Sequence, residues 1–478
     1  MDKPKKLKKC QQVEIDAADP FKNDVLNRKA NVEILTQFIT SYEQSIVLCI
    51  DAGWGQGKTT FIKMWQQYLK NQDIPTIYFN AWESDYTDDA LIALIGEIGL
   101  SIQELVGEDK TIAEKLLGHL YKLAVNFTKA AAPTMVNLII KAVCGSLTDA
   151  DEVSKASGNL SESLVKEQIT KYEESRKTLG SFKEALSELA RCYADGDAHK
   201  PMVIFIDELD RCRPNFAIEV LEKAKHLFNV DNIVFVLATD KTQLGHSIRA
   251  VYGQGLDVNG YLRRFIDFDY LLPILDEFNF IDSLFKKFSL NEHLKSITNY
   301  PIENVLKYTI GLYKLTLREQ EAFCNILNIV VRTNNHFVMD EYFLLCLLIV
   351  LKLKFPDLYN SLNKNNKNNF IDKALRNLNS QYSAYIDFDF DFDLHFDSYY
   401  LEFLELILLT VVRPDPSFSN EEIIDKYVRE YEFDDTKKQK LIKSLSMLGR
   451  YQANIYTLLL IKQAIEISTS FKLDNAAT

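Results

Sequence analysis

Short runs of apolar residues, each followed by turn or polar residues, recur along the first part of the chain. Five have the length of strands, at 45–50, 74–79, 202–206, 233–238 and 265–272. Apolar runs without alternation are typical of strands buried on both faces of a parallel sheet. A stretch of helical periodicity, at 60–69, follows the first of these runs. The pattern predicts an α/β fold in which helices cover both faces of a parallel sheet.

Longer helical patterns separate and follow the predicted strands. Residues 88–200 have helical spacing with few breakers, and this region is too long to be a simple crossover between strands. From 278 to the end the periodicity is mostly helical. We therefore predict a core made of 19–87 and 201–277, a helical insertion over 88–200, and a mainly helical C-terminal domain over 278–478.

Two apolar stretches invite comparison with membrane helices. Residues 343–351 are apolar throughout, but they are far fewer than the roughly 20 residues that cross a bilayer, so we predict a buried core helix there. Residues 130–147 are longer, yet Pro133 and Lys141 interrupt them. A membrane contact at 130–147 stays open, and we expect a cytoplasmic protein.

Composition narrows the choice of partners. The chain has 478 residues and a net charge of −12, so an acidic surface disfavours direct binding of nucleic acid. Five lysines within the first nine residues predict a basic flexible tail over 1–18, with a nucleic-acid or membrane contact as the alternative. The 7 cysteines show no paired metal spacing, which indicates a reducing compartment and no structural zinc site.

The most specific motif lies between the first predicted strand and its helix. Its glycines let the backbone curl so that consecutive N–H groups point inward and cradle phosphate oxygens. Lys58 should reach the β and γ phosphates, and the Thr59 hydroxyl is placed to ligate Mg²⁺. The predicted nucleotide-binding residues are Ala52, Gly53, Trp54, Gly55, Gln56, Gly57, Lys58, Thr59 and Thr60.

Acidic residues directly after the third predicted strand complete the expected site. Asp207 ends the strand and should hold the metal, so the predicted metal ligands are Asp207 and Thr59. Glu208 is placed to polarise the attacking water. Asp210 is a second candidate for either role, and Lys58 completes the predicted catalytic set. Capping of the following helix is the structural alternative for these carboxylates.

With these two motifs and three shorter segments, residues 19–273 resemble the KAP family of P-loop NTPases. The phosphate loop (Gly-Trp-Gly-Gln-Gly-Lys-Thr at 53–59) and the acidic motif extended to Asp210-Arg211-Cys212 carry most of the resemblance. The shorter segments are Asp-Val-Leu-Asn-Arg at 24–28, Phe-Asn-Ala-Trp-Glu at 79–83 and Tyr-Leu-Arg-Arg-Phe at 261–265. The sequence departs from the family at Ala52, where glycine is usual, and at Glu208, where many relatives carry aspartate.

The resemblance implies a P-loop sheet of the additional-strand type and an ATPase that uses ATP and Mg²⁺. It also implies a role in bacterial phage defence or exclusion. Our leading hypothesis is a nucleotide-driven switch that contacts protein partners through the insertion or the C-terminal domain. The alternatives are a nucleotide-gated scaffold that hydrolyses little, and a P-loop kinase.

Several residues near the motifs keep two interpretations. Trp82 and Asn80 are either a core residue and a helix cap or nucleotide contacts. Thr239 and Asp240 either sense the γ-phosphate or form a turn. One arginine could act across the interface of a homo-oligomer, and the others would then form surface ion pairs. The candidates are Arg211, Arg213, Arg263 and Arg264.

Residues 386–396 alternate isoleucine, phenylalanine or leucine with aspartate or histidine. This period of two predicts a strand with one apolar and one acidic face. The structural interpretation is an edge strand whose charges block aggregation, and the functional one is an acidic docking surface for a basic partner.

Overall fold

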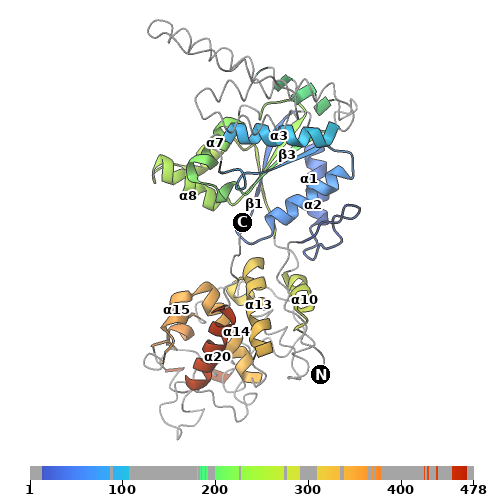
Figure 1. The fold of residues 1–478 in the computed structure, drawn as a ribbon. Helices are drawn as coiled ribbons and strands as arrows, with labels where there is room; N and C mark the ends of the chain where they lie inside the picture. Colours follow the sequence, from blue (N-terminus) through green and yellow to red (C-terminus); the bar gives the residue numbers. More distant parts are fainter. Residues whose placement is uncertain are drawn as a thin grey trace, which may run out of the picture. The chain divides into compact units, whose positions relative to one another are not determined.

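The computed structural model describes most of residues 13–106, 200–290, 309–377 and 455–470, with short pieces at 180–191 and 422–439. The chain divides into two compact units (Figure 1). We call Val13–Leu275 the sheet unit and Asp276–Thr478 the helical unit. Each is described by itself.

The sheet unit is built on five strands that all run parallel. Their order is β2-β3-β4-β1-β5, so β4 lies between the strand before the phosphate loop and the strand before the acidic motif. This is the additional-strand arrangement, and the predicted α/β fold is confirmed. The strands are β1 (Ile46–Asp51), β2 (Thr76–Asn80), β3 (Met202–Asp207), β4 (Ile233–Thr239) and β5 (Phe268–Leu271).

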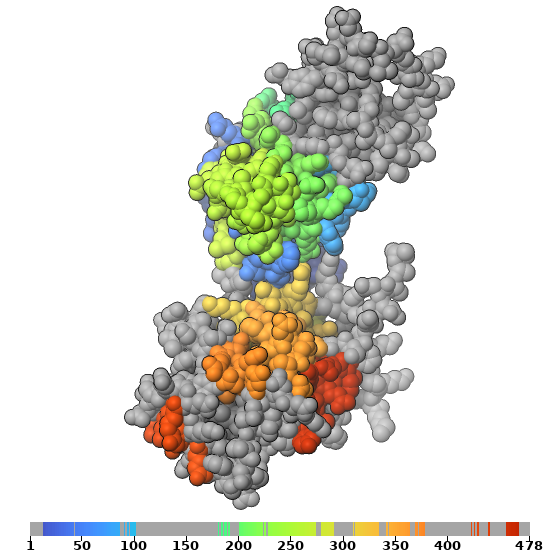
Figure 2. Space-filling view, turned by 90° about the vertical axis from the view of Figure 1, so that its left-hand side faces the viewer, coloured from blue at the N-terminus to red at the C-terminus, as the bar shows by residue number. Residues whose placement is uncertain are grey.

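Helices cover both faces of this sheet, as the apolar runs predict. In β1, Val47 and Cys49 face one apolar core, and Ile46, Leu48 and Ile50 face the other. Helices α1 (Lys29–Thr40) and α2 (Lys58–Lys70) pack on the second of these faces (Figure 1). The first face is covered by α3 (Ala90–Val106), α7 (Pro214–Ala224), α8 (Lys241–Tyr252) and α9 (Val258–Leu262). Of these helices, α8 and α9 contribute to one exposed side of the unit, in yellow-green in Figure 2.

Two expected boundaries need correction. The fifth strand begins at Phe268 rather than 265, because Phe265 and Ile266 are buried in the helix-covered core ahead of it. The flexible tail predicted over 1–18 includes a residue that is held against the fold. The Ala17 carbonyl accepts hydrogen bonds from Asn71 Nδ2 at 2.9 Å and Gln67 Nε2 at 3.2 Å. These contacts tie the end of the predicted tail to the last turn of α2 and its C-cap.

The helical unit has one extensive apolar core. Helix α14 packs against α13, α15 and α20, and its residues from Leu344 to Leu351 are almost completely buried. The prediction of a buried core helix at 343–351 is confirmed. Within the described residues, no helix combines the length and the apolar character needed to cross a bilayer. The helices are α10 (Glu277–Phe288), α13 (Leu317–Thr333), α14 (Met339–Lys354), α15 (Pro356–Ser361) and α20 (Ile455–Ser470).

Some predictions concern residues outside the described part of the chain. They include the lysines of the tail, the apolar stretch at 130–147 and the alternating segment at 386–396. These stay predictions.

Candidate nucleotide-binding site

The polar residues picked out by the sequence meet at one edge of the sheet. Strand register pairs Asn80 of β2 with Asp207 of β3, and Asp51 of β1 with Thr239 of β4. All four residues end their strands. Because parallel strands present their carboxyl ends on the same side, four loops converge there, and this is where α/β sheets bind ligands.

The phosphate loop has the curled backbone that its glycines predict. Gly55 and Gly57 have φ angles of 79° and 76°, in the left-handed region that glycine adopts without strain. Helix α2 begins at Lys58, directly after Gly57. The Gln56 side chain braces the loop, because its Oε1 accepts a hydrogen bond from the Gly53 N–H at 2.8 Å. A helix N-terminus therefore follows a loop that is already bent to receive an anion.

The departure at Ala52 has a simple structural account. Its side chain is 1% exposed and belongs to the core under α1 and α2. Its N–H donates to the Thr239 carbonyl at 3.3 Å, which continues the contact between β1 and β4. The backbone of Ala52 does not adopt a positive φ. No glycine is required at this position, and the methyl group contributes to packing.

Lys58 lies against both the loop and the acidic motif. The side chain is buried, with 8% of the residue exposed. Its Nζ donates to the Ala52 carbonyl at 3.0 Å and lies 3.6 Å from Asp210 Oδ1. Thr59 and Thr60 follow in the first turn of α2, where both are half-buried. The predicted lysine thus has a carbonyl and a carboxylate as partners.

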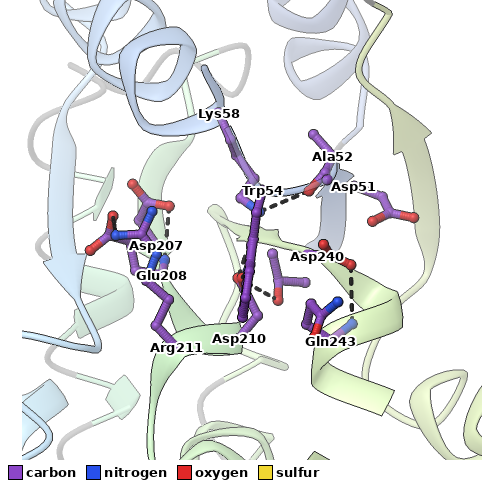
Figure 3. Close-up of polar contacts among 12 residues, drawn as sticks. Asp51, Ala52, Trp54, Lys58, Asp207, Glu208, Asp210, Arg211, Asp240 and Gln243 are labelled. Atoms are coloured by element: carbon purple, nitrogen blue, oxygen red, sulfur yellow. Dashed lines mark hydrogen bonds and ion pairs between the residues drawn. The ribbon is translucent and has the colours of Figure 1, made fainter. Parts of the chain in front are cut away.

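Asp210 connects the lysine to the tip of the loop. Its Oδ2 accepts a hydrogen bond from Trp54 Nε1, and its Oδ1 accepts one from the Thr239 hydroxyl at 3.1 Å. Figure 3 shows the Trp54 side chain extending from the loop toward Asp210. Trp54 is 48% exposed, so its ring forms part of the rim of the site. Asp210 therefore contacts Lys58 and Trp54, on the side of the acidic motif that faces the loop tip.

Asp207 is completely buried at the end of β3. Its Oδ2 accepts a hydrogen bond from the Tyr78 hydroxyl at 2.9 Å, and its Oδ1 accepts one from the Glu208 N–H at 2.8 Å. Burial raises the pKa of Asp207, and hydrogen bonds from Tyr78 and Thr59 oppose that rise. The Asp207 carboxylate is thus held in place by neighbouring donors beside Thr59.

Glu208 has a strained backbone and several polar neighbours. Its φ is 61°, which is uncommon for a residue with a Cβ and costs roughly 1–2 kcal/mol. Glu208 Oε1 forms an ion pair with Arg211 Nη1 at 2.7 Å and lies 3.4 Å from Thr59 Oγ1. Its Oε2 lies 3.4 Å from Asn80 Nδ2. The carboxylate therefore lies between the loop and the ends of β2 and β3.

The oxygen atoms gathered here are suitable ligands for Mg²⁺. The Thr59 hydroxyl is close to the carboxylates of both Asp207 and Glu208. Hydroxyl and carboxylate oxygens are hard ligands, and Mg²⁺ sites in nucleotide-binding proteins typically combine one or two of them with phosphate oxygens and water. The chemistry of these side chains fits the predicted ligand pair of Thr59 and Asp207.

Two interpretations of neighbouring residues can now be decided. Trp82 is not a core residue: it is 53% exposed, and the Arg211 guanidinium lies over its ring at 5.7 Å. The aromatic residue follows the strand end and so lies outside the core. Asn80 Oδ1 accepts from the N–H groups of Trp82 and Glu83 at 3.1 and 3.3 Å, so it caps a turn rather than a helix.

The other neighbours have structural partners. Asp240 caps α8 by accepting from the N–H groups of Thr242 and Gln243. Arg213 donates to the Asp85 carboxylate through its backbone N–H at 2.7 Å and its Nε at 2.9 Å, which ties the loop after β3 to the loop after β2. Arg263 and Arg264 are exposed, and a role for either across a subunit interface stays a prediction.

Sequence reasoning missed Tyr78. The residue lies two positions before the end of β2, and its hydroxyl reaches Asp207 on the adjacent strand. The only signal in the sequence is a tyrosine within an apolar run, which needs a polar partner for its hydroxyl when it is buried. The partner itself depends on β2 lying beside β3.

Comparison with known proteins agrees with this geometry. The model of the KAP family P-loop domain matches residues 28–383. A similar protein is the "Uncharacterized protein MJ0182" of Methanocaldococcus jannaschii, which is 25% identical over 171 residues, covering 34% of this chain and 88% of that protein. The family match covers well over half of the chain, the sheet has the additional-strand order, and the phosphate loop meets the acidic motif. The chain belongs to the KAP family of P-loop NTPases.

Proposed function

We propose that this protein binds and hydrolyses ATP with Mg²⁺ and that the nucleotide cycle makes it a switch. One observation carries the proposal: the phosphate loop and the acidic motif, far apart in the sequence, are in direct contact through several side chains. Lys58 Nζ lies 3.6 Å from Asp210 Oδ1, and Thr59 Oγ1 lies 3.4 Å from Glu208 Oε1. A phosphate, a metal ion and a water molecule all have partners within this small space.

Each residue has a distinct task in this proposal. The N–H groups of the loop and Lys58 bind the phosphates and stabilise negative charge as the terminal phosphoryl group leaves. Thr59 and Asp207 hold Mg²⁺, which would neutralise charge on the phosphate oxygens when bound. Glu208 orients the attacking water and accepts its proton. Asp210 pairs with Lys58 when no nucleotide is bound, and it competes with the phosphates for Lys58 when nucleotide binds.

Contacts in the sheet unit supply a route for a switch. Arg213 ties the loop after β3 to Asp85, which lies shortly before α3. Binding of nucleotide would change the partners of Lys58 and Glu208, and the acidic motif would pass that change to the start of the predicted insertion. Protein partners of the insertion or of the helical unit would then respond to the nucleotide.

A nucleotide-gated scaffold with little hydrolysis is the second candidate. The observation in its favour is the 2.7 Å ion pair between Glu208 and Arg211. While the carboxylate is held in this pair, its Oε1 already has the guanidinium as a hydrogen-bond partner and is less available to orient a water molecule. Hydrolysis would then be slow unless the arginine moves.

Glu208→Gln separates the two candidates. We expect a hydrolysing switch to keep ATP binding and to lose release of inorganic phosphate by about a hundredfold or more. A scaffold would release little phosphate with either residue and would bind ATP alike. A P-loop kinase would show phosphate transfer to an added acceptor in place of release. Lack of ATP binding by the wild-type protein would refute both candidates.

A role in bacterial phage exclusion, in the cytoplasm, is proposed from the family resemblance alone. Plaque counts on cells that express the wild-type protein or Glu208→Gln test it. A reduction in plaques with the wild-type protein only would support a role that depends on hydrolysis. Equal counts on both strains and on cells without the protein would argue against it.

A further inference from the structure

The phosphate loop needs support on its outer side. When consecutive N–H groups of a loop point inward at an anion, the carbonyl groups of the same peptides point outward. Buried carbonyl oxygens without donors cost free energy, so a rigid cradle requires donors behind it. In this protein the donor comes from Arg28, the residue just before α1.

Arg28 binds two successive carbonyls of the loop. Its Nη2 donates to the Gln56 carbonyl at 2.6 Å, and its Nη1 donates to the Gly57 carbonyl at 3.0 Å. Only 2% of the residue is exposed, and the guanidinium carbon lies 5.8 Å from the centroid of the Phe61 ring in α2. The planar fork of arginine is suited to two adjacent acceptors in a way that a lysine ammonium is not.

A dedicated turn holds Arg28 in this position. The Asp24 carboxylate accepts hydrogen bonds from the N–H groups of Leu26 at 3.2 Å, Arg28 at 2.6 Å and Lys29 at 3.2 Å. Asn27 has a φ of 53°, which asparagine tolerates better than most residues. The segment 24–28 thus forms a tight turn whose last residue is aimed at the loop.

The guanidinium of Arg28 is buried without a close counter-ion. Burial lowers the pKa of Arg28 to about 10, the nearby Asp24 and Tyr270 oppose that fall, and the side chain stays positive at neutral pH. The described part of the chain offers it no ion pair within 4 Å, and its buried Nε has no hydrogen-bond partner there. A buried charge without a close counter-ion costs free energy, and an anion bound nearby would offset part of that cost.

The peptides that Arg28 contacts are those that face the expected phosphates. The Gln56 carbonyl belongs to the same peptide group as the Gly57 N–H, and the Gly57 carbonyl belongs to that of the Lys58 N–H. A charge-assisted hydrogen bond to a carbonyl polarises its peptide group and makes the N–H a stronger donor. The Gly57 carbonyl also accepts from the Phe61 N–H at 3.0 Å, so the same contact anchors the start of α2.

We propose that Arg28 is a positioning residue for the phosphate loop, and that its buried charge is matched by a di- or triphosphate bound on the opposite side of the loop. The inference rests on the proposed nucleotide binding and adds a residue to it that lies outside both motifs. Arg28 acts through the loop and touches no substrate.

The test compares Arg28→Met with Arg28→Lys and with the control Arg332→Met. Arg332 is a matched control because it is half-buried in the helical unit and also donates to a carbonyl, that of Phe288 at 3.1 Å. Two quantities are measured: equilibrium binding of ATP and ADP with Mg²⁺, and the thermal unfolding midpoint without nucleotide. Wild-type binding is measured first, and its absence would refute the proposed function rather than the role of Arg28.

For Arg28→Met we expect about ten- to a hundredfold weaker binding of ATP and ADP, from the loss of two charge-assisted hydrogen bonds. The unfolding midpoint without nucleotide should fall no further than that of Arg332→Met. Arg28→Lys should bind ATP and ADP with intermediate affinity, because it keeps the charge but cannot donate to both carbonyls as the planar guanidinium does. If Arg28→Met does not fold, the affinity of Arg28→Lys provides the test. Unchanged affinity in a folded Arg28 variant, with a lowered midpoint, would overturn the proposal.

Discussion

The two units of this protein differ in what they bury. Among the described residues, and leaving tyrosine and cysteine aside, the buried polar side chains of the helical unit are uncharged, whereas the sheet unit buries six charged side chains. Those of the helical unit are Thr309, Gln320 and Asn328. Those of the sheet unit are Arg28, Lys58, Asp207, Glu208, Asp210 and Asp240.

The difference shows where the fold accepts a cost in stability. Removing a charge from water costs several kcal/mol even after the protein relaxes, and pairing offsets only part of this. The helical unit avoids that cost with a continuous apolar core around α14. The sheet unit concentrates its buried charges at the strand ends and around the phosphate loop. We therefore expect substitutions in the sheet unit to change ligand binding and those in the helical core to change stability.

Lys58→Ala should show the largest effect. Loss of the ammonium removes the main side-chain contact to the phosphates, and we expect ATP turnover to fall about a thousandfold. Phosphate release at saturating ATP measures it. The control is Lys354→Ala, whose Nζ donates to the Lys314 carbonyl at 2.7 Å in the helical unit. Similar losses in both variants would contradict a specific role for Lys58.

Leu348→Ala tests the other half of the comparison. Leu348 is completely buried in α14, and its truncation leaves a cavity, so we expect the free energy of unfolding of the helical unit to fall by about 3 kcal/mol. Denaturant titration measures the loss. Nucleotide affinity should stay at the wild-type value. A large drop in nucleotide affinity at denaturant concentrations too low to unfold the protein would show that a change in the helical core also affects the sheet unit.

Asp210→Asn should raise nucleotide affinity. The substitution removes the negative charge 3.6 Å from Lys58, which competes with the phosphates for the ammonium, and we expect binding about tenfold tighter. Stability without nucleotide should fall, because Lys58 loses its charged partner. Calorimetric titration and thermal unfolding measure the two effects.

Asp240→Asn is the control for Asp210→Asn, since asparagine also caps a helix. Weaker binding by Asp210→Asn would assign Asp210 to the metal or water instead.

Tyr78→Phe should produce the smallest change, a shift in pH dependence. The Tyr78 hydrogen bond stabilises the Asp207 carboxylate and lowers its pKa, so its removal raises that pKa. Mg²⁺ needs the ionised carboxylate, and on acidification metal-dependent ATP binding should therefore fail at a higher pH than in the wild type. Titration of binding from neutral to acid pH measures the shift. Tyr68→Phe, on the same face of the sheet, should leave it unchanged, and a shift in the opposite direction would contradict the geometry.

Much of the sheet unit could be predicted from local patterns. The apolar run before Asp207 predicted β3, and the glycines before Lys58 predicted the bent loop ahead of α2, although the helix begins two residues before the expected 60. Of the two interpretations of Trp82, the core residue was wrong, because large aromatic residues are usually buried and nothing local showed that this one follows a strand end at the rim of the site.

The sequence by itself determined which residues can bind a phosphate or a metal ion, since backbone freedom at glycine and the chemistry of lysine and carboxylate are local properties. The tertiary structure decided which of them meet. The order of the strands brings Tyr78 to Asp207, and the packing of α1 beside α2 brings Arg28 to the Gln56 and Gly57 carbonyls. Such contacts depend on how distant segments pack, and no spacing along the chain encodes them.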